Sequence, residues 1–338
     1  MAGGSNFERK NILVTGGAGF IGSHLCDRLI KDANVICVDN FITSSVANID
    51  HLLREPHFEF INHDITQPLD LSRYHELERF KLPYQGVQEI YHLACPISKR
   101  HFDDYKIATV LTNSIGVKHV LDLAVANHAK VLYASSGVLY GHRGEETRRT
   151  VKETDECRLD HLTTRGAYDE GKRFSEAILQ TYADVYGLDV KIARIFRTYG
   201  PRMKIFDGNL IPDMVLNALD GKDILISGDE ETMVSLAFVQ DIVDGIIRLM
   251  QSPIEITVVN LGSDQEVRLV NVAQKILQIT GSDSRVRFEP HVHQYIDPGL
   301  PDTSRAKDLL GWIPLVRLDD GLKRMVDYAN SNKNLVTF

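Results

Sequence analysis

Short apolar runs alternate with longer amphipathic stretches through the first part of the chain. The runs are rich in β-branched residues and lie at 12–14, 35–38, 58–61, 90–93, 131–134 and 190–193. Such alternation is typical of βαβ units whose parallel strands are covered by helices on both faces. The pattern therefore predicts an α/β fold with a doubly wound parallel sheet.

The rhythm changes at about residue 197. Residues 209–212 open a helix, 224–226 form a short strand, and 237–239 lead into a helical stretch at 242–250. The length of 338 residues corresponds to about two domains at roughly 150 residues each. We therefore expect a first domain over 1–196, completed by about 236–265, and a smaller C-terminal α/β lobe over 197–235 and 266–338.

One long polar stretch interrupts the alternation. Residues 141–166 are charged and lack apolar periodicity, which predicts a surface excursion between a strand and a helix. Functional loops often lie at such places, so this stretch is a candidate lid.

Composition excludes several classes of partner. With 46 acidic and 38 basic residues the net charge is -8, the wrong sign for neutralising nucleic acid phosphates or binding an anionic membrane. The four cysteines form neither a C-x-x-C pair nor a Cys/His cluster, so no metal site or disulfide framework is indicated. No apolar leader segment and no run of about 18 apolar residues is present, so we expect a cytoplasmic protein without a membrane span.

A glycine-rich turn follows the first predicted strand. Gly16, Gly19 and Gly22 fit a G-x-x-G-x-x-G spacing, with Phe20 and Ile21 between them and a helix beginning directly afterwards. Such a turn lets the backbone approach a pyrophosphate, which then lies at the helix N-terminus. The sequence therefore predicts a Rossmann-type dinucleotide site.

An acidic residue in the second strand specifies the cofactor. Asp39 lies 17 residues past Gly22, where a carboxylate can accept hydrogen bonds from an adenosine ribose. It would repel a 2′-phosphate, and residues 40–48, starting with Asn40, include no Arg or Lys to bind one. NAD is therefore favoured over NADP. Further expected cofactor contacts are Asp64, Ile65, Leu93 and Ala94, although these four positions are equally consistent with ordinary strand ends.

Three side chains form a candidate catalytic set. Tyr168 and Lys172 are four residues apart and share one face of a predicted helix, while Ser136 ends the strand that begins at 131. A tyrosine whose ordinary pKa is about 10 needs roughly 4 kcal/mol of stabilisation to act as a base near neutrality. The ammonium of Lys172 and an oxidised nicotinamide could supply it, with both residues contacting the cofactor. Ser136 would hold the reacting oxygen of the substrate.

With these motifs the chain resembles the extended short-chain dehydrogenase/reductase family, in particular its NAD-dependent nucleotide-sugar epimerases, dehydratases and decarboxylases. The greatest likeness is to the UDP-glucuronate decarboxylase group, through INHDI at 61–65, HLACP at 92–96, NSIG at 113–116, YDEGKR at 168–173, ARIF at 193–196, GPRM at 200–203 and LGW at 310–312. The resemblance implies a Rossmann domain carrying NAD and a smaller lobe carrying a nucleotide sugar, most often a UDP-sugar. It also implies a homodimer built through two helices of each subunit.

Four positions depart from the decarboxylase pattern. Gly137 and Val138 stand where that group carries Ser-Glu and where dehydratases carry Asp-Glu, and Gly299 or Leu300 stands where it carries an Arg. Near the substrate diphosphate, Arg197 replaces an Asn and Val234 replaces an Arg.

We therefore hypothesise that Arg197 binds the diphosphate in place of the missing guanidinium. The alternative is that Arg197 is paired structurally and that backbone N–H groups and Asn209 hold the diphosphate, with Leu210 beside the nucleotide. The functional hypotheses are oxidation of the sugar at C4 followed by decarboxylation, or by epimerisation at C4. A hypothesis from another class is an NAD-binding regulatory or scaffold protein without turnover.

Overall fold

A seven-stranded parallel sheet forms the centre of the structure. The computed structural model describes residues 9–98, 101–141, 150–157, 159–205, 207–253, 258–290 and 298–332. The strand order is β12-β7-β5-β4-β1-β2-β3, and every pair of neighbours is parallel. The strands are β1 (Asn11–Thr15), β2 (Asn34–Asp39), β3 (Phe58–Asn62), β4 (Glu89–His92), β5 (Lys130–Ser136), β7 (Val190–Ile195) and β12 (Val258–Leu261). The predicted Rossmann-type α/β fold with a doubly wound parallel sheet is confirmed.

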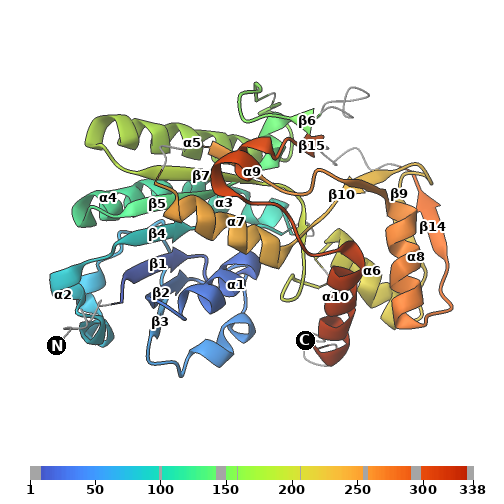
Figure 1. The fold of residues 1–338 in the computed structure, drawn as a ribbon, viewed down its shortest axis with the longest axis horizontal. Helices are drawn as coiled ribbons and strands as arrows, with labels where there is room; N and C mark the ends of the chain where they lie inside the picture. Colours follow the sequence, from blue (N-terminus) through green and yellow to red (C-terminus); the bar gives the residue numbers. More distant parts are fainter. Residues whose placement is uncertain are drawn as a thin grey trace.

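Helices cover both faces of this sheet (Figure 1). Helices α4 (Val117–Asn127) and α5 (Gly166–Tyr186) bury one face, and α1 (Phe20–Leu29) and α7 (Val239–Gln251) bury the other. Successive residues of β1 pack on opposite faces of the sheet. Leu13 belongs to the apolar cluster that includes α4 and α5, whereas Ile12 and Val14 belong to the cluster that includes α1 and α7. Burial on both faces explains why the strands read as continuous apolar runs in the sequence.

A second group of elements lies at one end of the sheet, at the right of Figure 1. It contains α6 (Leu210–Leu219), α8 (Leu269–Thr280) and α10 (Leu318–Asn332), with β9 (Ile224–Ser227) parallel to β14 (Val286–Glu289) and β10 (Met233–Ser235) antiparallel to β13 (Glu266–Arg268). The predicted helix at 209–212 and the strand at 224–226 correspond to α6 and β9. In the sequence, α7 and β12 stand between the parts of this group, yet both belong to the large sheet layer.

Two short strand pairs connect the remaining segments. Strand β8 (Thr198–Tyr199) is parallel to β11 (Ala237–Phe238), and β6 (Thr150–Val151) is parallel to β15 (Leu300–Pro301), which precedes α9 (Ser304–Leu310). Strand β6 lies within the predicted 141–166 excursion, of which 142–149 and 158 lie outside the described residues. None of the helices in the described ranges carries an apolar stretch of the length that a membrane crossing needs.

Candidate active site

One large cavity brings the predicted site residues together. It has a volume of about 1370 Å³ and lies beyond the carboxyl ends of the parallel strands, between the sheet and the second group of elements. Its walls include every residue that the sequence suggested for cofactor, substrate or catalysis: Gly16, Gly19, Phe20, Ile21, Gly22, Asp39, Asn40, Asp64, Ile65, Leu93, Ala94, Ser136, Tyr168, Lys172, Arg197, Asn209 and Leu210. Their common location is observed, and their individual roles stay predictions.

The glycine turn is tight because its backbone segments touch. Gly16 has a φ of +71°, in the left-handed region, and a Cβ at Gly22 would lie 2.1 Å from the carbonyl oxygen of Gly16. No other residue fits at Gly22 without moving this turn. The turn leads directly into α1, whose first residues, Phe20, Ile21 and Gly22, line the cavity. These residues fit the diphosphate of a dinucleotide.

Asp39 is fixed at the end of β2 by three donors. Its Oδ1 accepts from the Phe41 N–H at 3.0 Å and the Ser44 hydroxyl at 2.7 Å, and its Oδ2 accepts from the Ala18 N–H at 3.1 Å. A carboxylate has about four acceptor positions, so capacity for ribose hydroxyls remains. Asp39 is 8% exposed and its remaining surface faces the cavity.

Ser136 ends β5 and begins the short helical turn at Gly137–Tyr140. Its Oγ accepts from the Val138 N–H at 3.3 Å. Its interaction with the phenol of Tyr168 lowers the pKa of that tyrosine. Ser136 therefore presents an oriented hydroxyl to the same part of the cavity as Tyr168.

Lys172 is buried one helical turn after Tyr168 on α5. Its Nζ donates to the Ala134 carbonyl at 2.8 Å and lies 4.6 Å from the ring centre of Tyr133 and 5.8 Å from that of Tyr168. Desolvation lowers the pKa of Lys172, while Cys95 and Glu176 oppose this shift. The aromatic faces and the carbonyl hold the ammonium at a fixed position one helical turn from Tyr168.

Desolvation raises the pKa of Tyr168 well above its ordinary value, and Cys95 adds to this shift. The hydrogen bond from Ser136 and the charge of Arg165 lower the same pKa. Burial of the phenol outweighs these two groups, and stabilisation of a phenolate by Lys172 together with an oxidised nicotinamide stays a prediction. A cationic nicotinamide beside the phenol would supply further stabilisation of the phenolate.

Arg165 is a cavity residue that the sequence reasoning missed. Its Cζ lies 5.9 Å from the ring centres of both Phe102 and Tyr168, and its Nη2 lies 3.5 Å from Oδ1 of Asp169. The Nε atom of Arg165 is buried and has no hydrogen-bond acceptor in the part of the chain that the structure describes. Helical spacing could have revealed it, since a residue three positions before Tyr168 lies on the same helix face.

Other wall residues were also not singled out from the sequence. Cys95 accepts a hydrogen bond from Asn113 Nδ2 at 3.1 Å, and Arg202 and Lys204 extend the cavity wall towards α10. Cys95 follows the predicted Ala94, and Arg202 lies in the 200–203 motif, so position alone could have suggested both. Among the described residues, no group of three or more His, Cys, Asp or Glu is placed to hold a metal ion.

The residues at the four departures also lie in or beside this cavity. Gly137 packs against Phe196, whose ring would be 2.9 Å from a Cβ at this position, and Val138 presents an apolar side chain. Arg197 and Val234 both line the wall, and Asn209 donates to the Lys204 carbonyl at 3.1 Å. Pro298 reaches the cavity immediately before Gly299. No carboxylate therefore occupies the position that Val138 fills.

The buried carboxyl of Asp169 makes stability depend on pH. Desolvation raises its pKa to about 6, although Arg165 lowers it. Above that pH, the ionised folded form is destabilised by about 3 kcal/mol relative to an unfolded chain with an ordinary pKa. We expect Asp169→Asn to gain free energy of unfolding relative to the original protein as pH rises from about 5 to about 8.

Urea unfolding at both pH values measures this difference. Asp184→Asn, at an exposed position of the same helix, is the matched control and should show no pH-dependent gain. An equal difference between Asp169→Asn and the original protein at both pH values would contradict the prediction.

Comparison with known proteins gives a consistent result. The profile described as "NAD dependent epimerase/dehydratase family" matches residues 12–262. UDP-glucuronic acid decarboxylase 1 of Xenopus tropicalis is 37% identical over 325 residues, covering 96% of this chain and 73% of that protein. Among solved structures, the UDP-glucose 4-epimerase of Thermotoga maritima, with UDP-glucose, superposes with a TM-score of 0.82 at 28% identity, covering 96% and 99% of the two chains. The UDP-glucuronic acid 4-epimerase of Bacillus cereus, with UDP-glucuronic acid and NAD, superposes with a TM-score of 0.81 at 27% identity, covering 95% and 99%.

Proposed function

Because this chain belongs to the NAD dependent epimerase/dehydratase family, we propose that it is an NAD-dependent enzyme that oxidises UDP-glucuronate at C4 and then releases its carboxylate as carbon dioxide. We choose an acidic sugar because the guanidinium of Arg165 lies beside Tyr168 and has a buried N–H without an acceptor in the described part of the chain. A cation next to the group that takes the C4 proton suits a substrate with a negative charge at C6.

The proposed cofactor residues are those of the glycine turn and the neighbouring strand ends. Gly16, Gly19 and Gly22 would approach the diphosphate of NAD, and Asp39 would accept from the adenosine ribose. When bound, NAD accepts a hydride from C4 and later returns it.

The chemical steps assign separate tasks to the side chains. Tyr168 takes the proton of the C4 hydroxyl while Ser136 holds the same oxygen. In the resulting β-keto acid the C5–C6 bond breaks, carbon dioxide leaves, and the electron pair moves to the C4 oxygen. Ser136 and the protonated Tyr168 stabilise that oxyanion by hydrogen bonds. A proton from water then adds at C5, and Tyr168 returns its proton to the C4 oxygen as the ketone is reduced.

The test is a proton NMR time course of the protein with NAD and UDP-glucuronate. The proposal predicts anomeric signals of UDP-xylose, a pentose product. The second candidate, 4-epimerisation, is favoured by the missing carboxylate at Val138 and predicts UDP-galacturonate instead. Stoichiometric NAD binding without reduction of NAD by any sugar nucleotide would support a regulatory protein without turnover.

Arg165 has its own expected effect. Arg165→Gln should lower kcat/KM for UDP-glucuronate by about 10- to 100-fold, because a charge-assisted hydrogen bond to the substrate carboxylate is lost. The dissociation constant for UDP, which lacks the glucuronate residue, should change little. The matched control is Arg173→Gln, an exposed arginine on the same helix that pairs with Glu170. Equal losses for UDP and UDP-glucuronate would contradict a role in recognising the sugar.

We further propose that Arg197, with Asn209 and Leu210, contacts the nucleotide diphosphate from the wall opposite Val234. All four line the cavity, which supports a shared role. Unchanged nucleotide-sugar affinity in Arg197→Ala would contradict it. We also propose the domain division given by the sequence, with 197–235 and 266–338 as the substrate lobe.

We propose that two chains form a homodimer through α3 (Lys106–Leu111) and α5. These helices pack on each other and expose large apolar side chains, with Ile107 77% and Phe174 50% exposed. Ile107→Glu is expected to shift the protein from dimer to monomer in sedimentation velocity, because a charge would be buried in the interface. Leu315→Glu, also at an exposed apolar position, is the control. A monomeric original protein would contradict this interface.

We place the protein in a reducing compartment such as the cytoplasm. The support is that no disulfide joins Cys26, Cys37, Cys95 or Cys157 in the described part of the chain. No nucleic acid partner is proposed, since the net charge is negative.

A further inference from the structure

We propose that Arg202 is a positioning residue. Its ion pair with Asp27 fastens residues 200–205 and 207–209 of the cavity wall, here called the bridging segment, to α1. The helix that is proposed to bind the cofactor therefore also sets the position of the nucleotide-sugar site. This inference rests on the proposed function.

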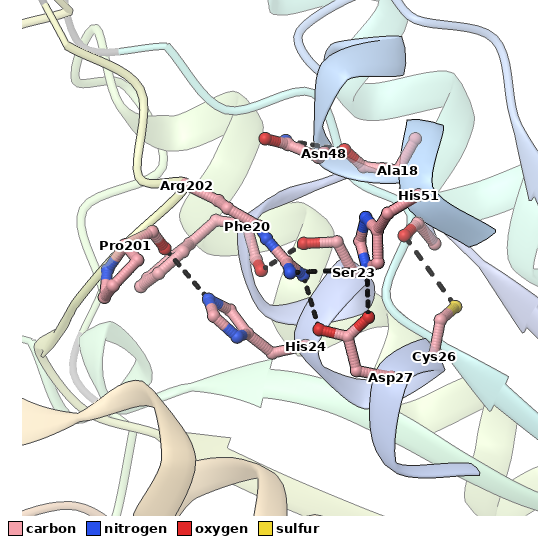
Figure 2. A network of polar contacts seen from close by, with 11 residues as sticks. Ala18, Phe20, Ser23, His24, Cys26, Asp27, Asn48, His51, Pro201 and Arg202 are labelled. Carbon is pink, nitrogen blue, oxygen red and sulfur yellow. Dashed lines mark hydrogen bonds and ion pairs between the residues drawn. The ribbon is translucent and has the colours of Figure 1, made fainter. Parts of the chain in front are cut away.

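The first end of the bridging segment is tied to α1 by two contacts (Figure 2). Arg202 Nη1 lies 2.8 Å from Asp27 Oδ2, and the Pro201 carbonyl lies 2.9 Å from His24 Nε2. The second oxygen of Asp27 lies 2.7 Å from His51 Nε2. Both carboxylate oxygens are therefore engaged, which fixes the direction in which the carboxylate faces Arg202.

The backbone of Arg202 is held in a conformation that needs such support. Its φ is +65°, in the left-handed region that is unfavourable for a residue with a side chain. Strained backbone of this kind persists when surrounding contacts determine it, and it is common where a segment is positioned for function. The backbone and the charge of Arg202 both lower the pKa of Tyr328 on α10, another cavity residue.

The far end of the bridging segment is tied to the same half of the molecule. The buried carboxylate of Asp207 accepts a hydrogen bond from Ser98, in the loop after β4. Between these anchors, Met203, Lys204 and Ile205 form cavity wall, and the segment leads to Asn209. A shift at Arg202 would therefore move wall residues proposed to contact the substrate.

Variants of Asp27 can distinguish a positioning role of Arg202 from direct contact between Arg202 and the ligand. Arg202 lines the cavity and could touch a ligand itself, whereas Asp27 is not among the residues of the cavity wall. A change at Asp27 therefore acts on the substrate site indirectly, by releasing Arg202 and the bridging segment. If the ion pair acts as a unit, removing either partner should have the same effect as removing both.

The experiment measures UDP binding by titration calorimetry on protein saturated with NAD, together with kcat and KM for UDP-glucuronate. Asp27→Asn and Arg202→Met are each expected to weaken UDP binding and raise KM by about tenfold, with kcat changed by less than about threefold. The double variant should lose about tenfold, not about a hundredfold. Asp27→Glu keeps the carboxylate and should bind UDP within about threefold of the original protein.

The control is Asp244→Asn, which removes a comparable ion pair with Arg248 on α7, outside the cavity wall. UDP binding by Asp27→Asn at the original strength would overturn the inference, and so would a hundredfold loss in the double variant. Failure of the unmodified protein to bind UDP would instead overturn the proposed function, and the inference with it.

Discussion

Replacing Tyr168 by Phe is expected to lower kcat by about a thousandfold while leaving UDP affinity within about threefold. The substitution removes only the phenol oxygen of Tyr168, whose ring centre lies 5.8 Å from the Nζ of Lys172. General acid–base groups typically contribute about 10²- to 10⁴-fold to turnover. The measurement is the rate at which nucleotide sugar reduces bound NAD in a single turnover, followed by absorbance of the reduced nicotinamide.

Tyr182→Phe is the matched control for this variant. Tyr182 lies on the same helix, and its hydroxyl donates to Asp122 at the surface. We expect it to retain the original rate. A Tyr168→Phe protein that reduces NAD at more than about a tenth of the original rate would show that another group takes the C4 proton.

The second large effect concerns stability. Glu176→Leu is expected to lower the free energy of unfolding by about 3–5 kcal/mol, because it leaves the buried guanidinium of Arg194 without its counterion. Arg194 contacts both oxygens of Glu176, at 3.0 and 2.7 Å, and also lies 2.9 Å from the Tyr140 hydroxyl. Ser135 donates to the same carboxylate at 2.5 Å, so the end of β5 loses a partner as well.

Chemical denaturation at neutral pH measures this loss. The control is Glu170→Gln, which removes a solvent-exposed ion pair with Arg173 on the same helix and should cost less than about 1 kcal/mol. Adding Arg194→Met to Glu176→Leu should recover part of the lost stability, since the unpaired charge is removed. Full additivity of the two substitutions would show that the pair does not act as a unit.

Much of the sheet and of the cofactor site could be predicted from the sequence. The apolar runs identified six of the seven strands, because strands buried on both faces carry continuous apolar side chains. The sequence also predicted that the glycine turn and Asp39 lie at one site. This was possible because β1, the turn, α1 and β2 follow each other directly in the chain. Ser136 could be predicted because parallel strands end at one edge of the sheet. Tyr168, on α5, was predicted instead from its helical spacing to Lys172.

Contacts between distant segments could not be predicted in this way. The pairing of β6 with β15 joins Thr150 to Leu300, and no local pattern signals a pair of two-residue strands. Arg202 illustrates the same limit, since its partner Asp27 belongs to the first helix. The pKa of Tyr168 was also beyond the sequence, because it depends on how completely the folded chain excludes water from the phenol.

The position of β12 has a consequence for biosynthesis. Strand β7 ends at Ile195, but its outer neighbour in the sheet begins only at Val258. On the ribosome, the outer edge of β7 must therefore remain without its partner while the whole of α6, β9 and α7 is translated. Unpaired strand edges attract strands of other chains. Nascent chains released before residue 258 should accordingly aggregate and depend on chaperones, whereas the completed chain closes this edge itself.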